Sequence, residues 1–178
     1  MKKLNTTLLI NQLNELALQG PLFIIMIGAP GSGKSTFIKA LGQTLKFTVG
    51  STDDQIDAYA EKHGITYSQA FTRINFKHLK KQMMEDINAA ARVDRSVVID
   101  QTNMGRKQRK DKLALAGPNH VKVAIVFEVP EKELFERLEK REAATGKGVP
   151  KVAVYSMLKN YEAPTRDEGF DFCFELTQ

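Results

Sequence analysis

The sequence predicts an α/β fold in which a mostly parallel, five-stranded sheet lies between layers of helices in a three-layer sandwich. Unbroken apolar runs at 21–27 and 121–129 are typical of strands that are buried on both faces. Segments with helical spacing alternate with such runs, as expected for parallel strands joined by right-handed crossovers. With 178 residues, 42% of them hydrophobic, the chain is long enough for one core, so a single domain is expected over 1–178.

The elements are assigned in chain order from the apolar pattern. Strands are expected at 21–27, 46–51, 95–103, 121–129 and 170–176. Helices are expected at 34–45, 53–63, about 67–92, 105–115, 131–142 and 151–161. Leu9, Leu13 and Leu16 recur at helical spacing, so residues 1–20 are expected to form an amphipathic helix that ends at Gly20-Pro21.

The composition excludes some classes of protein. The formal net charge of +5 weakly favours an anionic partner such as nucleic acid or nucleotide phosphate. Cys173 is the only cysteine, which excludes an intrachain disulfide and a cysteine metal cluster and suits a reducing, cytoplasmic setting. Polar residues interrupt the N-terminal apolar stretch, and no run has the length of a membrane span, so no membrane association is expected.

The segment "GAPGSGKS" follows the first apolar run and opens a helix, which is the context of a phosphate-binding P-loop. Glycines in such a loop let successive backbone N–H groups point at phosphate oxygens, and the helix N-terminus adds partial positive charge. Lys34 is expected on the β- and γ-phosphates of ATP, and the Ser35 hydroxyl on Mg²⁺. The expected nucleotide-binding residues are Gly28, Ala29, Pro30, Gly31, Ser32, Gly33, Lys34, Ser35 and Thr36. The sequence thus predicts a P-loop NTPase fold that binds ATP with Mg²⁺.

Two adjacent acids, Asp53 and Asp54, come just after the second strand. Ligands of parallel sheets bind at the carboxyl ends of strands, so these acids are expected opposite the P-loop. Transfer of a phosphoryl group to a hydroxyl needs a carboxylate that accepts the proton and orients the attacking oxygen. Asp53 is the candidate for this role and Asp54 the substitute. Ser51, Thr52 or Asp53 can also cap the following helix, and the two roles do not exclude each other.

Asp100 ends the third strand and is a candidate second Mg²⁺ residue beside Ser35, although an aspartate there can also cap a turn. Thr102 and Asn103 can shape that turn or contact substrate. The basic segment "GRKQRK" at 105–110 can bind substrate phosphates, but such a run is more often a solvated helix face.

Arg137 and Arg141 are four residues apart and therefore share one helix face, next to a Gly-rich loop at 143–150 that suits a lid. Cations on a mobile segment stabilise charge on a transferring phosphoryl group. Alternatively, Arg137 pairs on the surface with Glu133, one turn earlier. Spacing alone does not decide between these two roles.

Five segments occur in the order found in the polynucleotide 5′-hydroxyl kinase family, the P-loop phosphotransferases of phage RNA repair and animal DNA end repair. They are the P-loop, "STDDQID", "VVIDQTN", "ERLEKRE…GKGVP" and "YEAPTRDEGF". The chain resembles this family over about residues 21–176. The last segment is the most distinctive match, and it is also similar to small phage ATPases.

This resemblance implies an ATP-dependent kinase that phosphorylates 5′-hydroxyl ends of RNA or DNA, in the host cytoplasm if a phage encodes it. It implies that Asp53 is the general base and that Arg141 and Arg137 are lid arginines on the donor phosphates. Phage members often read R-D-D-x-R around the base, whereas this chain has Thr52 and Ile56 at the two arginine positions. No phosphatase motif D-x-D-x-T occurs in the sequence.

Three functions fit the motifs. A polynucleotide kinase needs a basic groove that leads to Asp53, whereas a small-molecule or nucleotide kinase needs a closed pocket there. The third is an ATP-binding module with little transfer activity, whose helices contact nucleic acid or protein. The sequence leaves the acceptor, the oligomeric state and the role of the N-terminal helix open.

Overall fold

The computed structural model describes residues 1–177, except for the side chain of Ser68, and confirms the α/β fold. Six parallel strands form one sheet in the order β1-β6-β5-β2-β4-β3. The strands are β1 (Lys2–Leu4), β2 (Leu22–Ile27), β3 (Thr48–Gly50), β4 (Val97–Ile99), β5 (Val121–Phe127) and β6 (Phe172–Leu176). The helices are α1 (Thr6–Ala17), α2 (Lys34–Leu41), α3 (Asp53–His63), α4 (Tyr67–Arg73), α5 (Phe76–Arg92), α6 (Arg106–Leu113), α7 (Glu131–Thr145) and α8 (Lys151–Lys159).

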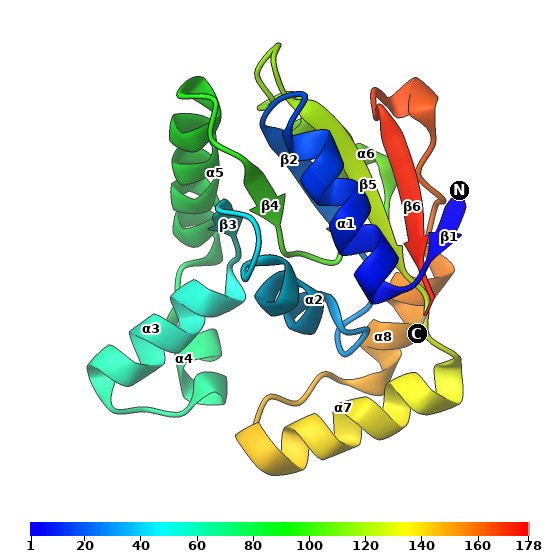
Figure 1. Cartoon of the computed structure of the whole chain (residues 1–178). Coiled ribbons are helices and arrows are strands. Elements are labelled where there is room, and N and C mark those ends of the chain that lie inside the picture. The colour runs from blue at the N-terminus through cyan, green and yellow to red at the C-terminus, as the bar shows by residue number, and fades with distance from the viewer. Residues whose placement is uncertain (178) are drawn as a thin grey trace.

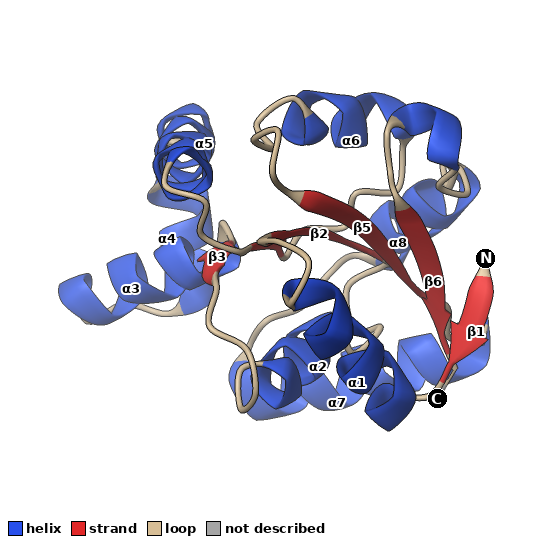
Figure 2. Cartoon of the chain, turned by 45° about the horizontal axis from the view of Figure 1, so that its top comes forward, coloured by secondary structure: helices blue, strands red, loops and turns tan. Residues whose placement is uncertain are grey.

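Helices cover both faces of the sheet (Figures 1 and 2). All six residues of β2 are buried, because alternate side chains point to opposite faces and both faces are covered. Leu22, Ile24 and Met26 pack with α1 and α2, whereas Phe23, Ile25 and Ile27 pack with α5 and α6. The predicted three-layer sandwich is therefore present. Among the described helices, none is long and apolar enough to cross a membrane.

The N-terminal segment differs from the expected helix over 1–20, and it supplies a sixth strand. Lys2–Leu4 pairs with Phe174–Leu176 at the sheet edge, and Lys3 forms an ion pair with Glu175 at 2.7 Å. Helix α1 begins only at Thr6, after Asn5 caps it by accepting a hydrogen bond from the Leu8 amide at 2.9 Å. A three-residue strand is too short to show a period of two, so its pattern in the sequence merged with that of the helix.

The expected helix over about 67–92 is two helices. Thr66 and Gln69 form a capping box at the start of α4, and Asn75 caps α5 by accepting hydrogen bonds from the amides of Lys77 and His78. Ile74 between them is extended. Helices α3 and α4 and the first turns of α5 share a small core of their own, which lies beside the β3 edge of the sheet (Figure 1).

The basic segment 105–110 is only partly the solvated face that was expected. Lys107 and Lys110 are exposed, but Arg109 is fully buried. Its Nε and Nη2 donate to the two carboxylate oxygens of Glu168 at 2.8 and 2.7 Å, and its Nη1 donates to the backbone oxygens of Asn103 and Met104. The guanidinium thus joins α6, the loop after β4 and the C-terminal tail.

The "YEAPTRDEGF" segment also contacts α6 through hydrogen bonds and an ion pair. Glu162 accepts a hydrogen bond from the Arg106 amide at 2.6 Å, and the Arg106 side chain pairs with Asp167 and donates to Thr165. The buried side chain of Lys112 donates to the Asn103 side chain. The most distinctive match to the kinase family therefore fixes the position of α6, and with it the loop that follows Asp100.

The ion pair between Arg109 and Glu168 is buried, so the loss of one partner is costly. Glu168→Gln should destabilise the protein by about 3–5 kcal/mol, because it leaves the Arg109 charge buried without its carboxylate. The replacement of both residues by methionine should cost less than the sum of the two single changes. Urea unfolding followed by circular dichroism measures the free energy of unfolding. The control is Asp167→Asn, which breaks an exposed pair and should have a much smaller effect.

Candidate active site

The P-loop runs from the end of β2 to the start of α2. Gly31 and Gly33 have φ angles of 81° and 95°, a left-handed conformation that favours glycine. Gly33 is the N-cap of α2, and no side chain caps the first amides of that helix. Those amides and the helix dipole are therefore available to an anion at the loop.

Lys34 is buried and lies against its own loop. Its Nζ donates to the backbone oxygens of Gly28 and Ala29 at 2.9 and 2.8 Å. Burial lowers the pKa of Lys34 to about 8, while the carboxylates of Asp100 and Asp53 oppose this shift and the Arg141 cation adds to it. The charge of Lys34 is thus coupled to those of Asp100, Asp53 and Arg141.

Ser35 and Asp100 are brought together by the pairing of two neighbouring strands. Ile25 of β2 lies opposite Ile99 of β4, so the P-loop and Asp100 leave the sheet at the same edge. The Ser35 hydroxyl donates to the Asp100 carboxylate at 2.9 Å. Burial raises the pKa of Asp100, and Lys34 and the Ser35 hydrogen bond oppose this rise. This pair of oxygen ligands suits Mg²⁺, which is held by few protein groups together with phosphates and water.

The structure describes no cluster of three or more histidine, cysteine or acidic side chains that could hold a metal by itself. The predicted alternative, that Asp100 only caps a turn, does not explain its bond to Ser35. Asn103, by contrast, shapes the turn: it is buried and donates to the Met26 backbone oxygen at 2.7 Å. Thr102 accepts a hydrogen bond from the Gly28 amide through its backbone oxygen.

Asp53 is the first residue of α3, and its side chain is 56% exposed. Its carboxylate accepts a hydrogen bond from the Tyr67 hydroxyl at 3.1 Å and lies 3.9 Å from Nη2 of Arg141. The amide of Asp54 donates to the Ser51 hydroxyl, so Ser51 provides the capping contact at this end of the helix. The Asp53 carboxylate is thus directed at α4 and α7 rather than at its own helix.

The two predicted lid arginines differ in their partners. Arg141 of α7 reaches across to Asp53, whereas Arg137 pairs with Glu133 at 2.5 Å, the surface pair that the spacing also allowed. Helix α7 continues to Thr145, three residues beyond its expected end, so the loop to α8 is shorter than the expected 143–150. Its left-handed Gly146 ends the helix.

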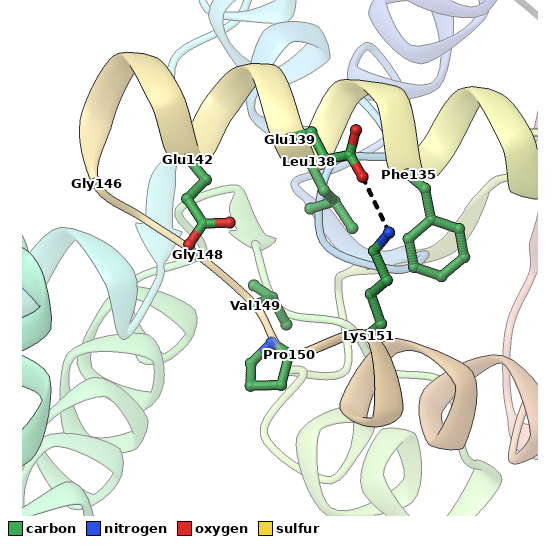
Figure 3. Close-up of a pocket in the computed structure, with 9 residues that line it drawn as sticks. All are labelled: Phe135, Leu138, Glu139, Glu142, Gly146, Gly148, Val149, Pro150 and Lys151. Carbon is green, nitrogen blue, oxygen red and sulfur yellow. Dashed lines mark hydrogen bonds and ion pairs between the residues drawn. The ribbon is translucent and has the colours of Figure 1, made fainter.

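The loop after α7 folds back against that helix and borders a cavity of about 380 Å³ (Figure 3). Lys151 of α8 donates to Glu139 at 3.0 Å across this cavity. A side-chain Cβ at Gly148 would lie 2.3 Å from a carboxylate oxygen of Glu142, so a larger residue there would displace the end of this exposed side chain. A second cavity, of about 190 Å³, lies beside Gly28, Ala29 and Ser32 of the P-loop.

Three residues of the site were not predicted from the sequence. Lys147, in the loop after α7, forms an ion pair with Asp57 at 2.5 Å, and its Nζ lies 4.7 Å from the centroid of the Tyr67 ring. Burial and the Asp53 carboxylate raise the pKa of Tyr67 well above its ordinary value. For Lys147, the only hint in the sequence was its position in the Gly-rich loop. Tyr67 and Asp57 occupy ordinary helix positions in the sequence.

Ile56, which replaces the second arginine of the phage R-D-D-x-R pattern, is buried in the small core of α3 and α4. Thr52, at the first arginine position, accepts a hydrogen bond from Gln101 at 3.5 Å. Neither side chain replaces the missing positive charge. The chain therefore carries no positive charge at these two positions.

Comparison with known proteins relates this geometry to a family. The profile of the AAA_33 family, described as an AAA domain, matches residues 23–164. Among curated proteins, the transcription factor bHLH140 of Arabidopsis thaliana is 28% identical over 159 residues, which make up 86% of this chain. The match covers only 16% of that plant protein.

Solved structures with a similar fold include RNA-repair and small-molecule enzymes. A chain of the Pnkp1/Rnl/Hen1 RNA repair complex has a TM-score of 0.65 at 25% identity, and the match covers 80% of this chain and 44% of that one. A sugar kinase from Janibacter sp. HTCC2649 has a TM-score of 0.57 at 20% identity, with 89% and 87% covered, and this likeness shows the fold alone. The chain therefore belongs to the AAA_33 family of AAA domains and has the fold of a P-loop kinase.

Proposed function

We propose that this protein is an ATP-dependent kinase that transfers the γ-phosphate to a 5′-hydroxyl end of RNA or DNA. The observation that carries the proposal is that the P-loop, Asp100 and Asp53 leave neighbouring strands at one edge of the sheet, with Asp53 contacted by groups from α4 and α7. A carboxylate beside a P-loop is the arrangement that phosphoryl transfer to a hydroxyl needs. The likeness to an RNA repair protein supports the choice of acceptor.

In this mechanism Asp53 accepts the proton of the acceptor hydroxyl and directs its oxygen in line with the phosphate. The Tyr67 hydroxyl donates to Oδ1 of Asp53 and so keeps the carboxylate in position. Lys34 exchanges the carbonyl oxygens of Gly28 and Ala29 for phosphate oxygens, and Arg141 neutralises charge that develops during transfer. Mg²⁺ would be held by Ser35 and Asp100 and would neutralise charge on the phosphates.

A small-molecule kinase is the second candidate, and the buried Ile56 favours it, because the phage-type arginine is absent at this position. Transfer from γ-labelled ATP with Mg²⁺ to a panel of acceptors separates the two. The panel holds 5′-hydroxyl RNA and DNA oligonucleotides, nucleoside 3′-monophosphates, nucleosides and nucleoside 5′-monophosphates. Label on oligonucleotide 5′ ends supports the proposal, and label only on a small acceptor contradicts it.

Asp53→Asn should lower kcat by about 10²–10⁴-fold, because it removes the proton acceptor. The dissociation constant for ATP, measured by calorimetry, should change little, since Asp53 does not belong to the P-loop. Asp54→Asn is the matched control and should retain activity. Unchanged turnover in Asp53→Asn would show that the protein binds ATP without using this carboxylate for transfer.

Arg141→Ala should lower kcat by at least about 100-fold, and by more than Arg137→Ala, because Arg141 pairs with Asp53 whereas Arg137 pairs with Glu133. Steady-state kinetics on the best acceptor measures the difference. Lys140→Ala, an exposed change on the same helix, serves as the control. A larger loss in Arg137→Ala would assign the main lid role to that residue instead.

Nucleotide affinity should depend on pH through Lys34. With a pKa of about 8 in the free protein, Lys34 keeps its proton below about pH 7, so the affinity should be constant there. Above pH 8 the free protein loses the proton that bound phosphate requires, so the affinity should fall by up to about tenfold per pH unit. Calorimetric titration with ATP from pH 6.5 to 9.5 tests this, and Lys34→Met should abolish the pH dependence.

A further inference from the structure

Two phenylalanines beside the candidate active site are left exposed. Phe71 of α4 and Phe76, the first residue of α5, are 47% and 42% exposed, and neither belongs to the small core of α3, α4 and α5. Phe76 lies seven residues before Met83, two turns earlier on the same face of α5. The apolar stripe of α5 therefore continues beyond the part that packs on the sheet.

The exposed rings form a connected row that begins at Asp53. The centroids of Phe71 and Phe76 are 4.6 Å apart with the planes at 64°, and those of Tyr67 and Phe71 are 6.1 Å apart. The Tyr67 hydroxyl donates to Asp53. Three aromatic rings thus lead from the proposed base, along α4, to the start of α5. Scattered exposed side chains are ordinary on a protein surface, but a contacting row that starts at a site is not.

The segment of the chain that carries these two phenylalanines is strongly basic. Residues 64–84 contain no aspartate or glutamate and carry four cations, Arg73, Lys77, Lys80 and Lys81. All four are exposed. Lys81 forms a long ion pair of 3.7 Å with Glu85, in the next turn of α5. Asp57 of α3, which lies near Tyr67, is paired with Lys147.

Flat aromatic faces flanked by cations match the chemistry of single-stranded nucleic acid, whose bases stack while its phosphates pair with lysine and arginine. We propose that Phe71 and Phe76, with these four cations, form a stacking platform. It binds the bases of a single-stranded acceptor that follow the 5′-terminal nucleotide. This proposal rests on the proposed function, because the row leads to Asp53, where the 5′-hydroxyl would lie. It also supplies the cationic contacts that Ile56 and Thr52 do not.

The platform restricts the acceptor. Bases in a duplex are already stacked on their neighbours and cannot lie on a protein ring without being unpaired. A single-stranded 10-mer should therefore be a better acceptor than the same strand in a blunt duplex. The helices α3 and α4 lie at the same end of the sheet as α7 (Figure 1), so a strand on α4 lies on the side of the molecule that carries the lid arginine Arg141.

The direct test is fluorescence anisotropy with a 3′-fluorescein, 5′-hydroxyl oligonucleotide of ten deoxythymidines, without nucleotide. Phe71→Ala/Phe76→Ala removes two stacking rings and should weaken binding by about 30-fold or more. Phe71→Tyr/Phe76→Tyr should retain binding, because it keeps the flat ring, whereas Phe71→Leu/Phe76→Leu should lose it. Retained binding in the leucine variant would overturn stacking in favour of general apolar contact. Both phenylalanines are exposed, and circular dichroism verifies that each variant folds.

The cations are tested separately. Lys77→Glu/Lys80→Glu should weaken binding and reduce the slope of log affinity against log salt by roughly 1.4, about 0.7 for each phosphate that the protein no longer neutralises. An unchanged salt dependence would exclude these lysines from the platform.

A kinetic series separates this proposal from the proposed function. In the wild type, kcat/KM should be higher for a 10-mer acceptor than for a 2-mer. In Phe71→Ala/Phe76→Ala the ratio of these two kcat/KM values should fall towards one. Phosphorylation of 5′ ends with the same length dependence in both proteins would overturn the platform and leave the kinase intact. Binding of the oligonucleotide through the two rings, with no transfer to any acceptor, would overturn the kinase and leave the platform.

Discussion

The parallel pairing of β2 with β4 is the constraint on which the site depends. This pairing lets the P-loop and Asp100 leave the sheet side by side, so that Ser35 can donate to Asp100 at 2.9 Å. The next pairing, of β4 with β3, places the loop before α3 at the same edge and so presents Asp53. Residues that are far apart in the sequence thus meet because three neighbouring strands run in one direction.

The second layer of the site is built by helices and loops rather than by the sheet. Asp53 receives Tyr67 from α4 and Arg141 from α7, and Lys147 connects the loop after α7 to Asp57 of α3. These contacts join α3 and α4 to α7 and to the loop that follows it. Helix α4 carries Tyr67, which contacts the proposed base, and Phe71, whose ring contacts that of Phe76 at the start of α5.

Much of the fold, with the position of the P-loop and of the aspartates at the strand ends, could be predicted from the sequence, because local patterns specify them. The run 21–27, the P-loop residues and the aspartates at strand ends each carry a signal within about ten residues. Strand β1 was missed because three residues show no period, and the break at Ile74-Asn75 was missed because apolar spacing continues through it. Tyr67, Lys147 and the burial of Arg109 could not be predicted, since each depends on contacts between residues that are far apart in the chain.

The contact between Arg109 and Glu168 spans 59 positions of the sequence. The guanidinium also holds the backbone of Asn103 and Met104, only a few residues after Asp100. A fragment that stops before residue 168 would have to bury this cation without its carboxylate, at a cost that small domains rarely tolerate. During synthesis the loop after Asp100 therefore acquires its final anchor late, after helices α1 to α8 have emerged. The geometry around Asp100 is in this sense completed by the segment that contains Glu168.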